Sequence, residues 1–333
     1  MMYTLGRRII GNGEILFPCV PTLIDPYMAK LSTFFEVLGK PFTDRELENL
    51  RRIVEEKLET GWRASPFSLL TVTYETKLPP HPGVQYVINT RVLTMEEQYN
   101  TWIAEREPPL FGKLADAMVL DVAAALGPAP AAPVLDVGAG TGRNALPLAR
   151  LGHPVDALEP VPALASMMKK ASAEENVPLN VIEGNVLDTG LTLRKNHYKL
   201  VVMAEVIASH FRDIDQVRNA LAALSDTVAA GGVLLFNAFL GMDGYKPDAM
   251  ARQVSQVMWS CVFTRNEFAS ITEALPLDRI ADESALEYEK SRLPADAWPP
   301  TGWFLEWAQG LDLFALPEGK APVELRWLTY RRR

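Results

Sequence analysis

The chain has 333 residues, of which 48% are hydrophobic, so it is long enough for one large core and an accessory piece. Its formal net charge is −8, which argues against binding nucleic acid through the phosphate backbone. No segment reaches the ~20 continuous apolar residues of a membrane-spanning helix. The two cysteines, Cys19 and Cys261, lack metal-ligand spacing. We therefore expect a cytoplasmic protein with reduced thiols and no metal site, nucleic-acid partner or membrane partner.

Residues 1–94 predict an α+β accessory domain. Arg7–Ile10 and Glu14–Phe17 flank a Gly-Asn-Gly sequence that is typical of a hairpin turn. Alternating apolar residues predict two further strands at 68–76 and 84–93. Nothing in this region carries recognisable chemistry, so we interpret it as either a lid or a dimerisation surface. The second interpretation would make the protein a homodimer.

Two helices are predicted in the accessory region, and a third opens the core domain. Apolar residues at helical spacing predict one over 25–38. Thr43 and Glu46 match a capping box, which predicts the start of a second helix that ends at Gly61. A third helix is expected over 95–106, where residues 95–333 begin to form the core domain.

The core domain reads as alternating strands and helices. Val134–Arg150 predicts a buried strand and a glycine-rich turn, with a helix over 142–151 after them, and a helix over 111–126 leads into this segment. Further strands are expected at 155–158, 180–183, 199–203 and 233–239, with helices at 163–173 and 215–228 between them. This alternation predicts an α/β fold with a parallel sheet covered by helices on both faces.

The chain then predicts a helix at 264–275 and strands at 279–289 and 323–330. Two insertions, 240–262 and 291–322, interrupt this part and are expected to cap the substrate site. They carry most of the aromatic residues we expect to line a substrate pocket, which are Tyr245, Trp259, Trp298, Trp303, Phe304 and Trp307, with Asn237 on the preceding strand.

The glycine turn carries the strongest functional signal. The run DVGAGTG at 136–142 has glycines at alternate positions, which let a ligand approach the main chain closely. Glu159 follows the next strand about 20 residues later, the separation at which a carboxylate can bind both hydroxyls of a ribose. A dinucleotide fingerprint would need a glycine where Arg143 stands, so an NAD-dependent dehydrogenase is disfavoured.

This run, with the strand ends that follow it, resembles motif I of class I S-adenosylmethionine-dependent methyltransferases. The resemblance implies a Rossmann-like methyltransferase core, with a mainly parallel seven-stranded sheet whose last strand is antiparallel, and S-adenosyl-L-methionine as cofactor. The cofactor-binding residues that it implies are Asp136, Gly138, Ala139, Gly140, Gly142, Asn144, Glu159, Pro160, Asn185, Val186, Ala204 and Glu205, with Tyr99 and Trp102 as an aromatic cover.

The resemblance also assigns roles to these positions. Asp136 and the turn would hold the methionine part of the cofactor, and Glu159 would hold the ribose. Asn185 departs from the usual aspartate at the adenine position, although its amide oxygen can still accept a hydrogen bond. His210 follows a strand's carboxyl end and is the candidate general base, with Glu205 as the weaker alternative.

These expectations lead to a methyltransferase that acts on a small-molecule acceptor. Two alternatives stay open. The enzyme could act on a peptide or carrier-bound substrate, with residues 1–94 as a docking surface. The fold could also bind S-adenosylmethionine without transferring a methyl group. The acceptor atom is not fixed by the sequence.

Overall fold

The structure is a computed structural model that describes residues 11–77, 83–314 and 320–333. The chain divides into two compact units, Met1–Thr101 and Trp102–Arg333. The division falls inside helix α3 (Met95–Glu105). Among the described residues, no helix combines the length and apolar character needed to cross a bilayer.

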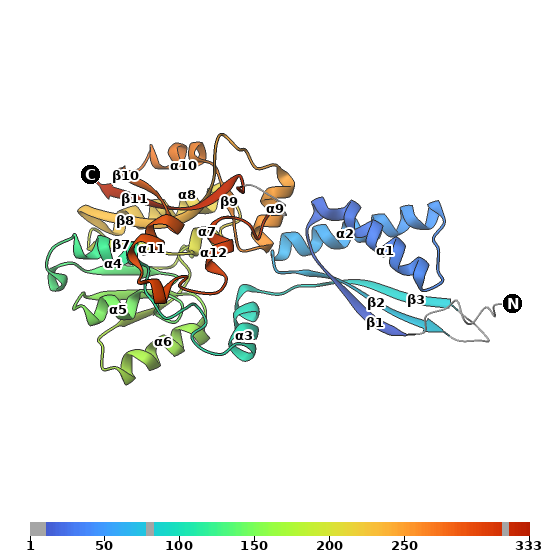
Figure 1. Cartoon of the computed structure of the whole chain (residues 1–333), viewed down its shortest axis with the longest axis horizontal. Helices are drawn as coiled ribbons and strands as arrows, with labels where there is room; N and C mark the ends of the chain where they lie inside the picture. The colour runs from blue at the N-terminus through green and yellow to red at the C-terminus, as the bar shows by residue number, and fades with distance from the viewer. Residues whose placement is uncertain (1–10, 78–82, 315–319) are drawn as a thin grey trace. The chain divides into compact units, whose positions relative to one another are not determined.

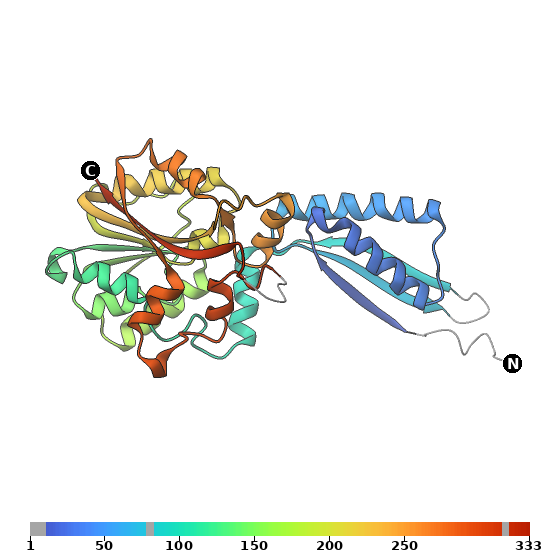
Figure 2. The same ribbon diagram turned by 45° about the horizontal axis from the view of Figure 1, so that its top comes forward.

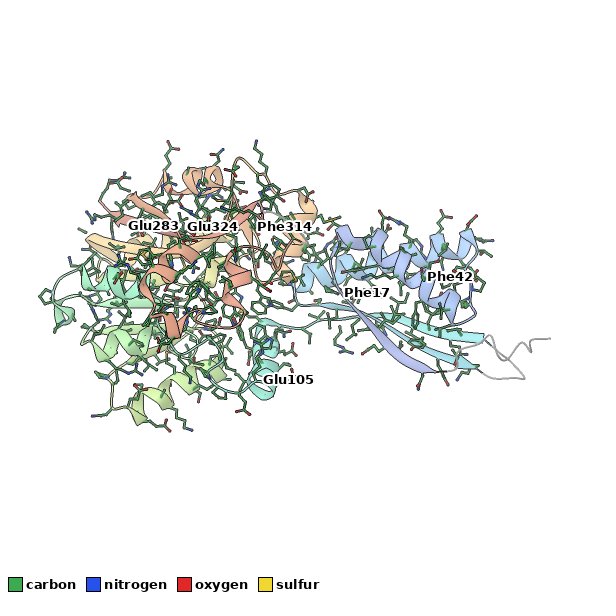
Figure 3. All side chains as sticks on the ribbon, viewed as in Figure 1. Phe17, Phe42, Glu105, Glu283, Phe314 and Glu324 are labelled. Atoms are coloured by element: carbon green, nitrogen blue, oxygen red, sulfur yellow. The ribbon has the colours of Figure 1, made fainter. Side chains whose placement is uncertain are left out.

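The N-terminal unit is a three-stranded antiparallel sheet with two helices on one face (Figures 1 and 2). Its elements are β1 (Asn12–Pro18), α1 (Ile24–Val37), α2 (Asp44–Ala64), β2 (Leu69–Lys77) and β3 (Gly83–Arg91). Aromatic pairs fill the layer between helices and sheet. Phe17 stacks on Tyr27, and Phe35 meets Phe42 edge-on. Phe17 and Phe42 lie at opposite ends of this layer (Figure 3).

One prediction for this unit is untested and one is wrong. Glu14–Phe17 does form a strand, and it pairs with β2, with Glu14 opposite Thr73. The predicted partner, Arg7–Ile10, lies outside the described residues. Helix α2 starts with the predicted capping box at Thr43 but continues through Gly61 to Ala64. Gly61 is a packing residue, because a Cβ there would lie 2.4 Å from the sulfur of Cys19.

The core unit is built on one large sheet with the strand order β10-β11-β8-β7-β4-β5-β6, and β9 pairs with β8 beside this path. The strands are β4 (Val134–Val137), β5 (Val155–Glu159), β6 (Asn180–Glu183), β7 (Tyr198–Met203), β8 (Val228–Gly241), β9 (Val262–Phe263), β10 (Leu277–Ser284) and β11 (Val323–Arg332). Strand β11 runs antiparallel to both β8 and β10, whereas the other pairs are parallel. The predicted antiparallel last strand is confirmed.

Helices cover both faces of this sheet. They are α4 (Ala117–Ala124), α5 (Ala145–Arg150), α6 (Pro162–Glu174), α7 (Val206–His210), α8 (Ile214–Thr227), α9 (Ala249–Val257), α10 (Arg265–Thr272), α11 (Ala285–Arg292) and α12 (Phe304–Ala308). One buried cluster joins α4, α5, α11 and α12 to the sheet, and a second joins α7, α8 and α10 to its other face. Figure 1 shows α8 and α10 on one side, with α5 and α6 on the other. The predicted α/β architecture is confirmed.

Three local predictions in this unit are wrong. The helix expected over 111–126 is limited to α4, because Gly112 has φ +89° and cannot continue a helix. Gly142, with φ +91°, likewise delays α5 to Ala145. The strand expected over 279–289 ends at Ser284, whose side chain accepts a hydrogen bond from the Glu287 N–H and so caps α11.

Candidate active site

The glycine turn lies between β4 and α5 and has the backbone that its composition predicts. Gly138, Gly140 and Gly142 have φ values of +69°, +57° and +91°. A Cβ on Gly138 would lie 2.4 Å from a methyl carbon of Val206, so no larger residue fits. Most N–H groups of the turn are already used. Those of Gly138 and Ala139 donate to the carbonyl of Leu158. The turn therefore offers close approach rather than a row of free donors.

Asp136, on β4, is the buried acid of the site. Its side chain is only 2% exposed, and its Oδ2 atom has no hydrogen-bond partner among the described residues. Burial raises the pKa of Asp136 to about 7, although the charge of Arg143 opposes this shift. A buried carboxylate oxygen without a partner is costly unless a ligand donates to it. Asp136 thus fits a cationic group such as an ammonium.

Glu159 ends β5 and binds the glycine turn. Its Oε2 accepts from the Gly140 N–H at 2.7 Å, and its Oε1 accepts from the Val161 N–H at 2.9 Å, with Pro160 between Glu159 and Val161 in the chain. Burial raises the pKa of Glu159, while these two hydrogen bonds lower it. Each carboxylate oxygen can accept a second hydrogen bond, so Glu159 keeps acceptor capacity for hydroxyl groups of a ligand.

Asn185 follows β6, as predicted, but its amide oxygen accepts from the Leu187 N–H at 2.9 Å. This bond closes a local turn and uses one of the two acceptor positions of the oxygen. The neighbouring Val186 packs against the sheet. Ala204 is half-buried at the end of β7. These residues occupy the same carboxyl edge of the sheet as Glu159, since β4, β5, β6 and β7 are parallel neighbours.

A buried ion network beside the turn was not predicted. The Arg143 guanidinium donates to Asp116 and to Glu205, each at 2.7 Å. Asn144, predicted to bind cofactor, instead donates to Asp116 at 2.9 Å and accepts the Asp116 N–H at 2.9 Å. Burial would lower the pKa of Arg143, but the two carboxylates outweigh it and raise that pKa. Glu289 accepts from the N–H groups at the start of α4, and burial raises its pKa to about 7.

His210 is the last residue of α7. Its ring meets Trp259 edge-on, with centroids 5.1 Å apart. Burial lowers the pKa of His210 to about 4, so the imidazole is neutral at physiological pH and can accept a proton, although as a weak base. Glu205 differs, because its carboxylate is bound to Arg143 and burial raises its pKa.

The two predicted aromatic cover residues belong to different units. Tyr99 lies in the N-terminal unit and Trp102 begins the core unit. Trp102 packs on Trp259 with centroids 4.7 Å apart, and the Arg106 guanidinium lies 4.1 Å from the Trp102 ring centre. An aromatic series therefore runs from Arg106 through Trp102 and Trp259 to His210.

The core unit has a pocket of about 610 Å³. Its walls come from 106–114 and 296–303, and include Arg106, Lys113, Asp296 and Trp303. Phe111 belongs to the first of these segments but does not line the pocket, and its ring lies 3.3 Å from where a Cβ on Gly140 would be, a contact that was not predicted. The segment that forms this wall therefore reaches the turn through Phe111, and no periodicity in this irregular segment could have indicated it.

The predicted pocket aromatics are divided between the pocket and the core. Trp303 lines the pocket, whereas Phe304 and Trp307 are buried. Trp307 donates through its indole N–H to the Trp259 carbonyl at 2.9 Å and packs on Phe239. Trp298 packs on Phe304, and Tyr245 on Phe314. Asn237 is buried and accepts from the Glu205 N–H at 2.6 Å. In the described part of the chain, no three His, Cys, Asp or Glu side chains form a group that could hold a metal ion.

Comparison with known proteins finds a family model that matches part of the core unit. Residues 134–232 match the family model of a methyltransferase domain. A search of curated proteins found no match. Among solved structures, a putative sarcosine dimethylglycine methyltransferase from Galdieria sulphuraria is 15% identical, with 65% of this chain and 83% of that chain covered and a TM-score of 0.47. Geranyl diphosphate C-methyltransferase from Streptomyces coelicolor A3(2) is 16% identical, with coverage of 65% and 79% and a TM-score of 0.49.

The matched segment runs from β4 into the start of β8 and so contains the glycine turn, Glu159 and the edge that follows β7. The antiparallel insertion of β11 is the arrangement that the methyltransferase resemblance implied. The buried, unpartnered oxygen of Asp136 and the spare acceptor positions of Glu159 fit the amino group and ribose of its cofactor. The core unit of this chain therefore carries, over residues 134–232, a segment that matches a methyltransferase domain.

Proposed function

We propose that this enzyme methylates a small-molecule acceptor that binds in the pocket between 106–114 and 296–303. The pocket volume of about 610 Å³ carries this proposal, because it lies within the ~300–1,000 Å³ range of sites for small organic ligands. Its position also supports the proposal, since the segment 106–114 that lines the pocket also contains Phe111, whose ring lies against Gly140 of the cofactor turn.

In this proposal the cofactor is held by the residues at the carboxyl edge of the sheet. Asp136 accepts from the amino group of its methionine part, Glu159 accepts from the ribose hydroxyls, and Asn185 accepts from the adenine amino group. Gly138 and Gly140 let the methionine part lie against the main chain, since neither carries a side chain. When bound, the cofactor would supply a methyl group on a sulfonium, from which a neutral thioether is a good leaving group.

The chain's contribution is then mainly positioning and, for an acceptor that carries a proton, a base. His210 is our proposed base, because it is neutral at physiological pH and adjoins the aromatic series that starts at Arg106 in the pocket wall. The low pKa of His210 suits an acceptor that is acidic enough to transfer its proton to a weak base.

The proposal is tested with S-adenosylmethionine carrying a heavy-isotope methyl group. The enzyme is incubated separately with a metabolite extract and with a protein fraction, and each is analysed by mass spectrometry. Label in a compound below about 1 kDa, which would fit the pocket, supports a small-molecule acceptor. Label only in the protein fraction would replace it with a peptide or carrier-bound substrate. S-adenosylhomocysteine binding without label in either fraction would favour a protein that binds the cofactor without transfer.

A further inference from the structure

Glu205 has an unusual backbone at a critical junction. It directly follows β7 and adopts φ +62° and ψ 8°, a left-handed conformation that residues other than glycine, asparagine and aspartate rarely adopt. Its N–H donates to the buried side chain of Asn237 on β8 at 2.6 Å. Non-glycine residues in such conformations persist only where their surroundings hold them, and they cluster at functional sites.

The side chain of Glu205 is held by the cofactor turn. Arg143, immediately after Gly142, contacts the Glu205 carboxylate through one nitrogen and the Asp116 carboxylate through another, each at 2.7 Å. The Arg143 side chain is 12% exposed, so solvent screens these bonds little. Asn144 fixes Asp116 through two further hydrogen bonds. The position of Arg143 is therefore determined by the segment before α4 as well as by Glu205.

The residue after Glu205 completes the connection. Val206 begins α7 and packs so tightly on Gly138 that a Cβ there would approach a Val206 methyl carbon to 2.4 Å. The same helix ends at His210. A change in the backbone of Glu205 would redirect α7 and thereby shift both its contact with the cofactor turn and the imidazole at its other end.

We propose that Glu205 is a positioning residue, and that Arg143 and Asn237 hold its left-handed backbone so that α7 packs on the cofactor turn. The carboxylate contributes a hydrogen-bond acceptor for Arg143 rather than a base. The part of this inference that concerns His210 rests on the proposed function. The part that concerns packing of α7 on the cofactor turn does not, because it is independent of which acceptor is methylated.

The test compares three substitutions by calorimetric titration with S-adenosylhomocysteine. Glu205→Gln keeps an oxygen that accepts from Arg143, so we expect an affinity within about threefold of the wild type. Glu205→Ala loses the acceptor and keeps a Cβ at φ +62°, so we expect at least about tenfold weaker binding. Glu205→Gly loses the same acceptor but adopts positive φ freely, so we expect it to bind better than the alanine variant.

Equal binding by the alanine and glycine variants would overturn the role of the backbone. A glutamine variant that binds like the wild type, but loses turnover and the basic limb of its pH profile, would instead make Glu205 a base. Should the alanine variant fail to fold in a thermal melt, the glutamine and Arg143→Lys variants decide the question. Lysine cannot bridge Asp116 and Glu205 as the planar guanidinium does, so this variant must also weaken binding, by about tenfold. Wild-type affinity in Arg143→Lys would refute the proposal that Arg143 holds the backbone of Glu205.

The matched control is Glu183→Gln. Glu183 ends β6, is exposed and pairs only with Lys169 among the described residues, so its neutralisation should leave the affinity unchanged. Failure of this inference is separable from failure of the proposed function. Binding of S-adenosylhomocysteine reports on the positioning role of Glu205, whereas the identity of the labelled acceptor reports on the substrate.

Discussion

Glu159 provides the sharpest test of how the cofactor site is built. Each of its carboxylate oxygens accepts one backbone N–H, from Gly140 at 2.7 Å and from Val161 at 2.9 Å. In Glu159→Gln, one oxygen becomes an NH₂ group that faces an N–H donor, so one of these bonds is lost and its donor is left buried. A hydrogen bond to a charged group contributes about 1.5–3 kcal/mol.

The expected loss of stability is smaller than this value, because burial raises the pKa of Glu159 and the uncharged amide is cheaper to bury. We expect Glu159→Gln to lower the free energy of unfolding by about 1–2 kcal/mol. Ligand affinity changes more. Losing one charge-assisted bond to a ribose hydroxyl should weaken S-adenosylhomocysteine binding about ten- to a hundredfold.

The assay is calorimetric titration of the folded variant, with a thermal melt to establish that it is folded. Glu183→Gln is the matched control, because Glu183 lies opposite Glu159 in the register of β5 and β6 but is exposed. Wild-type affinity in a folded Glu159→Gln protein would refute the ribose assignment. An equal loss in both variants would show that the effect is one of net charge alone.

Three further predictions follow from the site. His210→Ala should lower kcat about a hundredfold or more if the acceptor must lose a proton, and unchanged turnover in this variant would remove His210 as the base. In the wild type, the rate should show no change from histidine titration between about pH 6 and 9, because the pKa of His210 is about 4. The pKa of Asp136 is raised from 3.8 to about 7, so between these pH values the folded, ligand-free protein holds a proton that the unfolded chain releases. The free energy of unfolding should therefore fall as the pH rises from about 4 to about 7. In Asp136→Asn the melting temperature should fall less over this interval, and a fall equal to that of the wild type would contradict the reasoning. Gly138→Ala should abolish measurable cofactor binding, because it adds a Cβ 2.4 Å from Val206. The control is Gly127→Ala, which is also at positive φ but in open space; it should lose only about 1–2 kcal/mol of stability and keep wild-type affinity. Similar losses of binding in both variants would show that backbone strain, not contact with Val206, is decisive.

The elements that the sequence predicted well carry their signal locally. Helix α2 has a capping box and an apolar stripe within its own residues, and the parallel strands are short apolar runs between turns. The failures share a cause as well. Helix α11 and the irregular stretch before α4 depend on a cap at Ser284 and a positive φ at Gly112, which apolar periodicity does not encode. In each case a single residue, Ser284 or Gly112, sets the backbone direction.

The candidate site also has a part that the sequence encodes locally and a part that it does not. The glycine turn and the acid after β5 form a contiguous motif with fixed spacing, so the sequence alone could indicate them. The Arg143 network joins residues from three separate segments, with Asp116 before α4 and Glu205 after β7. No spacing rule links such partners. The one available signal was an arginine directly after the turn, where a buried charge needs partners from elsewhere in the chain.

The position of β11 between β8 and β10 has a consequence for biosynthesis. Strand β8 ends at Gly241, yet its antiparallel neighbour begins only at Val323. While the ribosome is still translating the intervening residues, the β8 edge has no neighbour on this side, and exposed strand edges are templates for aggregation. We therefore expect nascent chains stalled before Val323 to recruit chaperones, and expect the sheet to close only after β11 has left the exit tunnel.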